Sequence, residues 1–247
     1  MIFNYQIIIE YLGVNFVGWQ IQKNGASIQA EIERALSKAL KSKIKLIGSG
    51  RTDAGVNAWG QSANFKVNNE IKNIFKILTT VNFYLNKHSI SVIKLKKKNL
   101  NFHARHSAKK REYEYIIFNR KSKLAIDKDR VWLVKNNLDI KKMKKAIKFF
   151  KGTHDFSAFR ASSCSSKTPI RTITKTNLKK IKGKIIINFV SKSFLQKQVR
   201  SMVGCLKLVG ENKWKPEKIK YILKNKKRNL CAPPAPPEGL YLKQVLY

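Results

Sequence analysis

The chain has 247 residues and a formal net charge of +38, from 52 basic and 14 acidic side chains. Its hydrophobic fraction of 43% is ordinary for a globular protein and argues against disorder. The charge favours a polyanionic partner, most often nucleic acid, and three widely spaced cysteines argue against a disulfide framework or a structural zinc site.

The N-terminal sequence predicts a strand rather than a targeting segment. Glu10 interrupts the apolar run of residues 7–9, and no basic stretch precedes that run. No apolar window approaches the length of a membrane span. We therefore expect a cytoplasmic protein with no membrane association.

The first hundred residues predict the element order β-α-β-β-α-β. Strands are expected over residues 3–12, 45–47, 59–67 and 90–95. Ser27 is placed to cap a helix, whose apolar face carries Ile28, Ile32, Leu36 and Leu40. A second helix is expected within residues 69–85, with its apolar spacing at Ile71, Ile74, Phe75 and Leu78.

A second half begins near His106 and again mixes strands with helices. Strands are expected over residues 111–118, 131–134, 170–178, 185–190 and 240–246, and helices over 140–150, 194–209 and from Pro216. Polar, Ser-rich residues 152–167 predict a loop, and 182–184 a turn. We therefore expect an α+β protein with two similar halves, residues 1–105 and 106–247, whose mixed, mainly antiparallel sheets are flanked by helices.

A glycine-rich loop, residues 48–57, lies between two strands of the first half. Its glycines permit positive φ angles and a close approach to a ligand. Arg51 and Asp53 stand two residues apart on it, and an arginine can hold a carboxylate charged and directed into a cleft. The alternative is a tight turn in which Arg51 and Asp53 merely satisfy each other.

Arginine is the scarcer basic residue, with ten copies against 42 lysines. This lysine excess suggests drift toward AT-rich codons, so many lysines are expected to be solvated surface. We expect the positions that keep arginine to need a bidentate or stacked contact, because lysine cannot make one. The arginines that stand out are Arg51, Arg105, Arg111, Arg160, Arg171 and Arg200.

Two further residues stand out by their setting. Tyr113 projects from a strand in a basic segment, where it can stack on a nucleobase; the alternative is cross-strand packing. Arg200 lies in an apolar helical stretch, so it needs a partner or a solvent-facing position. Asp53 is a candidate partner.

Other familiar sites are not expected. His154 and Asp155 are adjacent in a loop and are not expected to form an acid–base pair. The sequence contains no P-loop, Rossmann glycine pattern or metal-ligand constellation. An enzyme of this sequence is therefore expected to work without a nucleotide cofactor or metal.

Motifs spread over the whole chain carry a family resemblance. The loop residues 50–56 form a Gly-Arg-Thr-Asp-Ala-Gly-Val signature, and further motifs follow in order at residues 18–20, 102–105, 111–115, 156–160, 167–171, 199–204, 232–234 and 239–242. Together they resemble the tRNA pseudouridine synthase A family. The sequence departs from the family pattern at Leu12, Asn57, Asn86 and residues 196–198.

The resemblance implies an isomerase that converts uridine to pseudouridine at positions 38–40 of the tRNA anticodon stem-loop, without cofactor or metal. It implies a homodimer, with a basic cleft between the two halves of each subunit. Asp53 falls on the catalytic aspartate, the nucleophile, and Arg200 on the residue that pairs with it. Arg51 falls on the arginine that flips the base, and Tyr113 on the aromatic that packs on it. Substrate contacts are also expected from Arg105, Arg111, Arg160 and Leu242.

The chemistry of this isomerisation suits a carboxylate. Breaking the N1–C1′ bond builds positive character at C1′, which a carboxylate can stabilise or trap covalently. A glycal route, which loses a proton from C2′, also needs a carboxylate, and the sequence leaves both open. The base must leave its stack to be reached. The alternative of another class is a non-catalytic basic RNA-binding protein, in which Asp53 is a structural partner of Arg51.

Overall fold

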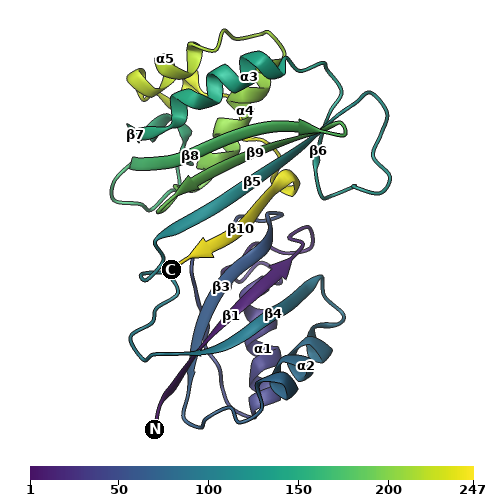
Figure 1. Ribbon diagram of the computed structural model, residues 1–247, viewed down its shortest axis with the longest axis vertical. Coiled ribbons are helices and arrows are strands. Elements are labelled where there is room, and N and C mark those ends of the chain that lie inside the picture. Colours follow the sequence, from purple (N-terminus) through teal and green to yellow (C-terminus); the bar gives the residue numbers. More distant parts are fainter. The chain divides into compact units, whose positions relative to one another are not determined.

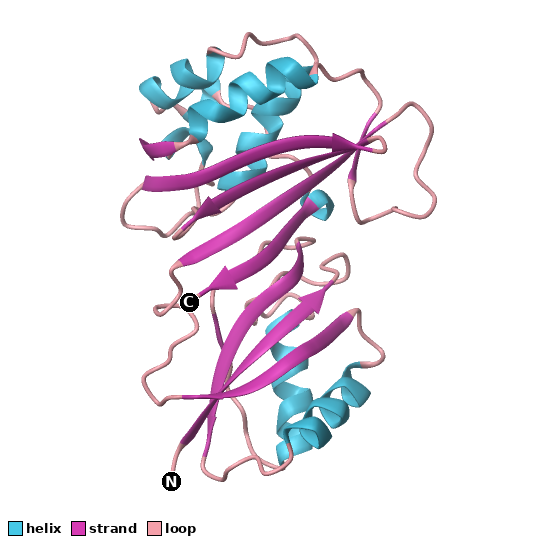
Figure 2. Cartoon of the chain, viewed as in Figure 1, coloured by secondary structure: helices cyan, strands magenta, loops and turns pink.

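A computed structural model describes all residues, 1–247, and contacts within it divide the chain into two compact units. Unit 1 comprises Met1–Lys109 and Leu242–Tyr247, and unit 2 comprises Lys110–Tyr241. Each unit combines a sheet with helices packed beside it (Figure 2), which confirms the predicted α+β class. The expected domain division after residue 105 stays a prediction.

Unit 1 has the predicted element order (Figure 1). Its elements are β1 (Phe3–Tyr11), α1 (Ile28–Leu40), β2 (Ile47–Gly48), β3 (Asn57–Val67), α2 (Ile74–Leu85) and β4 (Ile90–Lys98). β1 lies between β4 and β3 and pairs antiparallel with both, and β2 pairs antiparallel with β3. Most of β10 (Leu240–Leu246), from residue 242 onward, belongs to this unit and follows β3 in the strand order.

The first helix forms as its sequence predicts. The side chain of Ser27 accepts a hydrogen bond from the backbone N–H of Ala30, 3.3 Å away, and caps α1. The predicted apolar face is buried at Ile28, Ile32 and Leu36, and half-buried at its far end. Local capping and apolar spacing therefore decide this element.

The second helix starts later than predicted, at residue 74, and buries a different face. Its buried residues, Val81 and Leu85, lie in its C-terminal half, whereas Phe75 of the predicted face is 78% exposed. The cause is a tertiary contact: the side-chain amide of Asn82 donates to the carbonyl of Val92 in β4 at 3.0 Å and accepts from its N–H at 2.8 Å. These two bonds fix which side of the helix meets the sheet.

Unit 2 is built on an antiparallel sheet in the order β5 (Lys110–Asn119), β9 (Lys184–Ser191), β8 (Ile170–Ile181), β7 (Gly152–Asp155). The short strand β6 (Trp132–Val134) pairs with β5 in parallel. Three helices gather on one side of this sheet in Figure 1: α3 (Ile140–Ile147), α4 (Gln198–Gly210) and α5 (Lys218–Asn225). Lys182 and Gly183, with φ angles of 46° and 79°, form the predicted turn between β8 and β9.

Two predictions in unit 2 are wrong in detail. The polar residues 152–167 are not one loop, because β7 pairs with β8 through its backbone and Phe156 and Phe159 behind it are fully buried. α4 begins at residue 198 rather than 194. Lys197 has a left-handed φ of 61°, and the side chain of Gln198 accepts a hydrogen bond from the N–H of Leu195 at 2.8 Å, so the preceding residues fold back before the helix starts.

No helix in the structure is both long enough and apolar enough to cross a membrane.

Candidate functional site

The glycine-rich loop of unit 1 is fastened to β3 where it begins. The N–H of Ser49 donates to the carbonyl of Ser62 at 2.7 Å, and its hydroxyl donates to the side-chain carbonyl of Gln61 at 2.7 Å. The amide of Gln61 in turn donates to the carbonyl of Gly50 at 2.9 Å. The backbone therefore enters the loop in a defined position.

The middle of the loop is held at Thr52, immediately before Asp53. The hydroxyls of Thr52 and Tyr11 lie 2.8 Å apart, and the carbonyl of Thr52 accepts from the N–H of Trp19 at 3.1 Å. Gly18 allows this contact, because it has a φ of +113° and a Cβ there would lie 2.7 Å from the Thr52 carbonyl oxygen. Strand β1 and the turn after it thus clamp the residue that precedes the aspartate.

The loop ends in a tight turn around Asp53. The carbonyl of Asp53 accepts from the N–H of Val56 at 3.1 Å, and Gly55 takes a φ of 75°. The side chain of Asn57 is fully buried and accepts from the N–H of Gly13 at 2.8 Å. Asn57, one of the departures from the family pattern, is therefore a cap that ties the end of the loop to the turn after β1.

The clamped backbone leaves Asp53 half-buried and Arg51 exposed. Asp53 has an interaction of its own and is not without a partner. A turn in which Arg51 and Asp53 satisfy each other stays an alternative. The loop presents the aspartate on a rigid support that does not depend on its neighbouring arginine.

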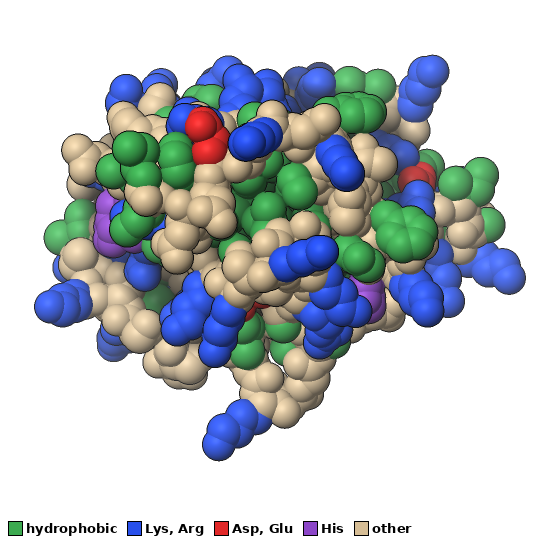
Figure 3. All heavy atoms as spheres, turned by 90° about the horizontal axis from the view of Figure 1, so that it is seen from below, with side chains coloured by type: hydrophobic (Ala, Val, Ile, Leu, Met, Phe, Trp, Pro, Cys, Tyr) green, Lys and Arg blue, Asp and Glu red, His purple; other side chains and the backbone are tan.

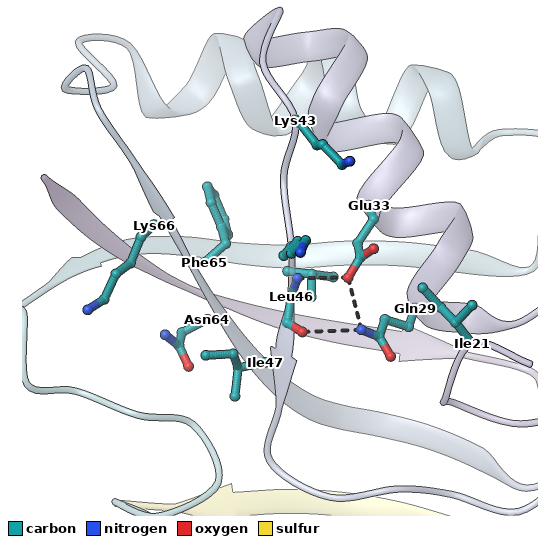
Figure 4. A pocket seen from close by; sticks show the side chains of 10 residues that line it. Ile21, Gln29, Glu33, Lys43, Leu46, Ile47, Asn64, Phe65 and Lys66 are labelled. Atoms are coloured by element: carbon teal, nitrogen blue, oxygen red, sulfur yellow. Dashed lines mark hydrogen bonds between the residues drawn. The ribbon is translucent and has the colours of Figure 1, made fainter.

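A pocket of 670 Å³ lies where α1 meets the segment leading into β2 (Figure 4). There Glu33 accepts a hydrogen bond from the N–H of Leu46 at 2.8 Å, while Gln29 donates to the Leu46 carbonyl at 3.2 Å and to Glu33 at 2.9 Å. No predicted site residue lines this pocket. Its polar contacts anchor the chain that feeds the glycine-rich loop.

Two other predicted contact residues belong to unit 1. Arg105 is exposed, and its backbone N–H donates to Nδ1 of His103 at 3.2 Å. Burial, then the neighbouring His106 and Arg105, lower the pKa of His103. Leu242 is fully buried in β10.

In unit 2, Tyr113 occupies a packed position on β5. It pairs across the sheet with Phe189 of β9, and its ring meets that of Phe194 edge-on, with centroids 5.1 Å apart and planes at 84°. Arg111, on the same face, is also buried and donates to the backbone carbonyl of Lys192. Both side chains are held in place by β9 and the segment after it.

Arg200 is half-buried on α4 and faces the proline-rich segment near the C-terminus. Its Nε donates to the carbonyl of Ala235 at 2.7 Å, and its own carbonyl accepts from the N–H of Ala235 at 2.9 Å. Nearby, Tyr115 donates to the carbonyl of Pro236 at 2.7 Å, and burial raises its pKa well above the usual value, a shift that Arg200 opposes. A purely solvent-facing Arg200, the alternative from sequence, is therefore wrong.

The remaining arginines differ in role. Arg160 is half-buried just after the 3-10 turn Ser157–Phe159. Arg171 donates to the carbonyls of Thr168 and Ile170 at 2.8 and 2.6 Å and to the hydroxyl of Ser166 at 2.5 Å. It therefore braces the loop before β8, a structural use of its planar fork.

His154 and Asp155 lie in β7 rather than in a loop, and their side chains have separate partners. Asp155 accepts from the N–H of Ser157 at 2.8 Å and lies 3.5 Å from the ammonium of Lys226. His154 contacts the carbonyl of Lys151 at 3.0 Å instead. The structure also contains no cluster of three or more His, Cys, Asp or Glu side chains suited to a metal ion.

Sequence reasoning missed the residues that hold the loop. Tyr11 is the last residue of an ordinary strand, and nothing local marks its hydroxyl as a partner of Thr52. Trp19 belongs to a family motif, but only the fold shows that its backbone supports the residue before Asp53.

Basic side chains are spread over the face seen in Figure 3, whereas acidic ones are few there.

Comparison with known proteins gives a family-model match to part of the chain and relatives that match nearly all of it. A family model described as tRNA pseudouridine synthase matches residues 146–247. The chain is 58% identical over 245 residues to tRNA pseudouridine synthase A of Pelagibacter ubique, covering 99% of this chain and 100% of that protein. The proteins of the same name from Ehrlichia canis and Ehrlichia chaffeensis are each 45% identical over 244 residues, covering 98% of this chain and 99% of each relative.

Proposed function

The chain belongs to the tRNA pseudouridine synthase A family, and on that premise we propose how its residues carry out the reaction. It is an isomerase that forms pseudouridine in tRNA. The observation that supports the proposed mechanism best is the clamped loop, which carries a half-buried aspartate behind a backbone fixed by Tyr11 and Trp19. A support of this kind suits a group that must meet one carbon atom in a defined geometry.

We propose that Asp53 acts at C1′ of the target uridine. Its ionised carboxylate either adds to C1′ as the N1–C1′ bond breaks, or assists loss of the C2′ proton on a glycal route. The freed uracil rotates and C5 bonds to C1′, with release of the Asp53 carboxylate on the covalent route or return of a proton to C2′ on the glycal route. The proton on C5 is then removed, and N1 carries a proton in the product. Both routes require Asp53 to be charged, and neither draws on a metal or a cofactor.

Arg200 is proposed as the cation that keeps Asp53 ionised. Its guanidinium is oriented by the Nε bond to the carbonyl of Ala235, and a guanidinium is a fixed-charge group that can bind a carboxylate through several donors. Arg51, which is exposed on the loop, is proposed to face the displaced base. Tyr113 is proposed to pack on that base and to assist removal of its C5 proton.

We further propose that the substrate region is the anticodon arm of tRNA, contacted by Arg105, Arg111 and Arg160, with the fully buried Leu242 acting through packing rather than through contact with the RNA. The formal charge of +38 supports such binding, because each phosphate contact releases a counterion. We propose the cytoplasm as the place where the chain meets tRNA.

The proposed mechanism is tested with Asp53→Asn and a matched control, Asp129→Asn, at an exposed aspartate in a loop of unit 2. We expect Asp53→Asn to bind tRNA within a few fold of wild type and to form no pseudouridine, whereas Asp129→Asn retains both properties. Release of tritium from C5 of labelled uridine measures the reaction, and filter binding measures the affinity. Wild-type turnover by Asp53→Asn would refute the role of this carboxylate.

We also propose that the chain forms a homodimer through the exposed face of α2. Phe75, Phe83 and Tyr84 on this helix are 78%, 67% and 41% exposed, and Lys76 is its only charged residue. Exposed apolar surface of this kind marks an interaction site. Because every copy is strongly positive, a second copy can approach closely only where charge is low, and α2 offers such a surface.

The dimer is tested by light scattering of Phe83→Glu, with Ile126→Glu as control at a loop residue that is 88% exposed. We expect the Phe83→Glu variant to be monomeric, and the Ile126→Glu variant to be dimeric like the wild type. A dimeric Phe83→Glu variant would exclude this surface, and a monomeric wild type would exclude the dimer.

A further inference from the structure

Two cysteines far apart in the sequence lie in contact in unit 2. The sulfur of Cys205 on α4 is 3.5 Å from that of Cys231, which follows the short turn Arg228–Leu230. Cys205 is fully buried and Cys231 is half-buried, so Cys231 is the more accessible residue of the pair. Both are free thiols, and neither belongs to the site described above.

The surrounding backbone holds the two sulfurs together. After Cys231 the chain runs back along α4: a Cβ on Gly204 would lie 2.2 Å from the carbonyl oxygen of Pro233, and Ala235 is bonded to Arg200. This close fit needs a glycine at position 204, since any larger residue would push the segment away. We call residues 231–235 the strap.

Charge around the pair makes the two thiols unequal. The guanidinium of Arg228 donates to the carbonyls of Ala158 and Ala232 at 3.1 and 3.3 Å, which fixes it beside Cys231. A hydrogen bond from the Cys205 thiol lowers the pKa of Cys231, and Arg228 lowers it further against the effect of burial. The same bond and burial raise the pKa of Cys205. Low pKa, partial exposure and a second thiol in contact are the features of an oxidant-sensitive cysteine.

We propose that Cys231 and Cys205 form a peroxide-sensitive dithiol whose oxidation ties α4 to the strap by a disulfide bond. The Cys231 thiolate attacks one oxygen of hydrogen peroxide and becomes a sulfenic acid, and hydroxide leaves. The Cys205 sulfur then attacks the sulfenic sulfur, and the hydroxyl group leaves with the thiol proton as water. Two thiols and one peroxide molecule thereby give one disulfide and two water molecules.

The geometry allows this bond with a small movement. The sulfurs must approach from 3.5 Å to about 2.05 Å, the length of a disulfide bond. The strap is bonded to α4 through Ala235 and Arg200, four residues after Cys231, so the movement falls on Cys231 itself, which follows the short turn Arg228–Leu230. The bond would close the chain between residues 205 and 231, including α5. Closure of such a loop restricts the unfolded chain and stabilises the folded one.

The test treats reduced, purified full chain with hydrogen peroxide and follows intact mass and peptide maps. We expect the loss of two hydrogen atoms per chain, a Cys205–Cys231 cross-link, and reversal by dithiothreitol. Cys164→Ser, at the third cysteine, serves as the matched control and should behave as wild type. A cross-link that involves Cys164, or the absence of any intramolecular disulfide, would overturn the proposal.

Variants of the pair test the assigned order of attack. Cys205→Ala should trap Cys231 as a sulfenic acid that dimedone labels, whereas Cys231→Ser should leave Cys205 unlabelled because it is buried. Circular dichroism checks that each variant is folded, and Cys205→Ser replaces Cys205→Ala if it is not. Peroxide should raise the thermal unfolding midpoint of wild type and Cys164→Ser but not of Cys205→Ala. Labelling of Cys205 in Cys231→Ser, or an unchanged midpoint in the oxidised wild type, would overturn the assignment.

Discussion

Replacing Gly18 by alanine tests whether the clamp on the loop, rather than the overall stability, sets the position of Asp53. Gly18 has a φ of +113°, and a residue with a side chain is strained there by about 1–3 kcal/mol. Its Cβ would lie 2.7 Å from the Thr52 carbonyl oxygen, so the loop must move and the bond from Trp19 weakens, at about 1 kcal/mol. The expected loss of about 2–4 kcal/mol leaves a typical protein of 5–15 kcal/mol folded.

The catalytic effect should be larger than the stability effect. The residue next to Asp53 must shift to relieve the contact, and a misplacement of about 1 Å costs on the order of 10²-fold in rate. Single-turnover formation of pseudouridine with excess enzyme measures this loss directly, and chemical denaturation measures the stability of the same preparation.

A matched control separates the two effects. Gly183 also has a positive φ, 79°, but a Cβ there would contact only the ring of Phe118, at 3.3 Å. Gly183→Ala should therefore cost about 1–2 kcal/mol of stability and leave the rate unchanged. A wild-type rate for Gly18→Ala, or an equal rate loss for Gly183→Ala, would refute the clamp.

Three further predictions follow from particular contacts. Tyr11→Phe removes the hydroxyl bonded to Thr52, and should cost about 1–3 kcal/mol and lower the single-turnover rate; an unchanged rate would show that Trp19 alone suffices. Burial alone would raise the pKa of Glu211, but hydrogen bonds from Lys207, Asn136 and Lys213 outweigh it and hold that pKa below its usual value. The ionised Glu211 side chain therefore stabilises the folded protein fully above about pH 4.3, the ordinary glutamate pKa, and this stabilisation is lost as pH falls through the lower pKa of the folded state. The difference in unfolding free energy between wild type and Glu211→Gln should shrink over that acid range. A constant difference would contradict the pKa shift. Finally, tRNA affinity should fall linearly with salt concentration on logarithmic axes, and salt-insensitive binding would argue against phosphate contacts.

Local sequence rules account for the elements whose signals are local. Ser27 caps α1, and Lys182 with Gly183 turns β8 into β9, because a cap and a positive φ depend on a few neighbouring residues. Alternating and helical apolar spacing placed both halves of the α+β fold, since burial of one face is periodic along the chain.

Most of the wrong predictions concern elements whose bounds or buried face depend on a residue far away in the sequence. β7 is polar and was missed, because its pairing with β8 uses backbone groups that any residue carries. α2 buries its C-terminal half instead of the predicted face because Asn82 bonds to β4. The late start of α4 has a local cause instead, because Lys197 takes a left-handed φ and the side chain of Gln198 bonds back to Leu195.

The candidate site divides in the same way. The motif around Asp53 is one contiguous segment, so its residue types and their resemblance to a family could be read from the sequence. The hydroxyl of Tyr11 and the backbone of Trp19 reach the loop from other segments, and Asn57 at the end of the loop bonds to Gly13 in the turn after β1. These roles depend on the pairing of β1 with β3.

By itself, then, the sequence determined the fold class, the enzyme family and the candidate aspartate, because these follow from local periodicity and from contiguous motifs. Only the tertiary structure decided that Tyr11 and Trp19 hold the residue before Asp53, that Asn57 is a structural cap, and that Cys205 and Cys231 are in contact. Those facts depend on which distant segments meet, and no spacing along the chain encodes such a meeting.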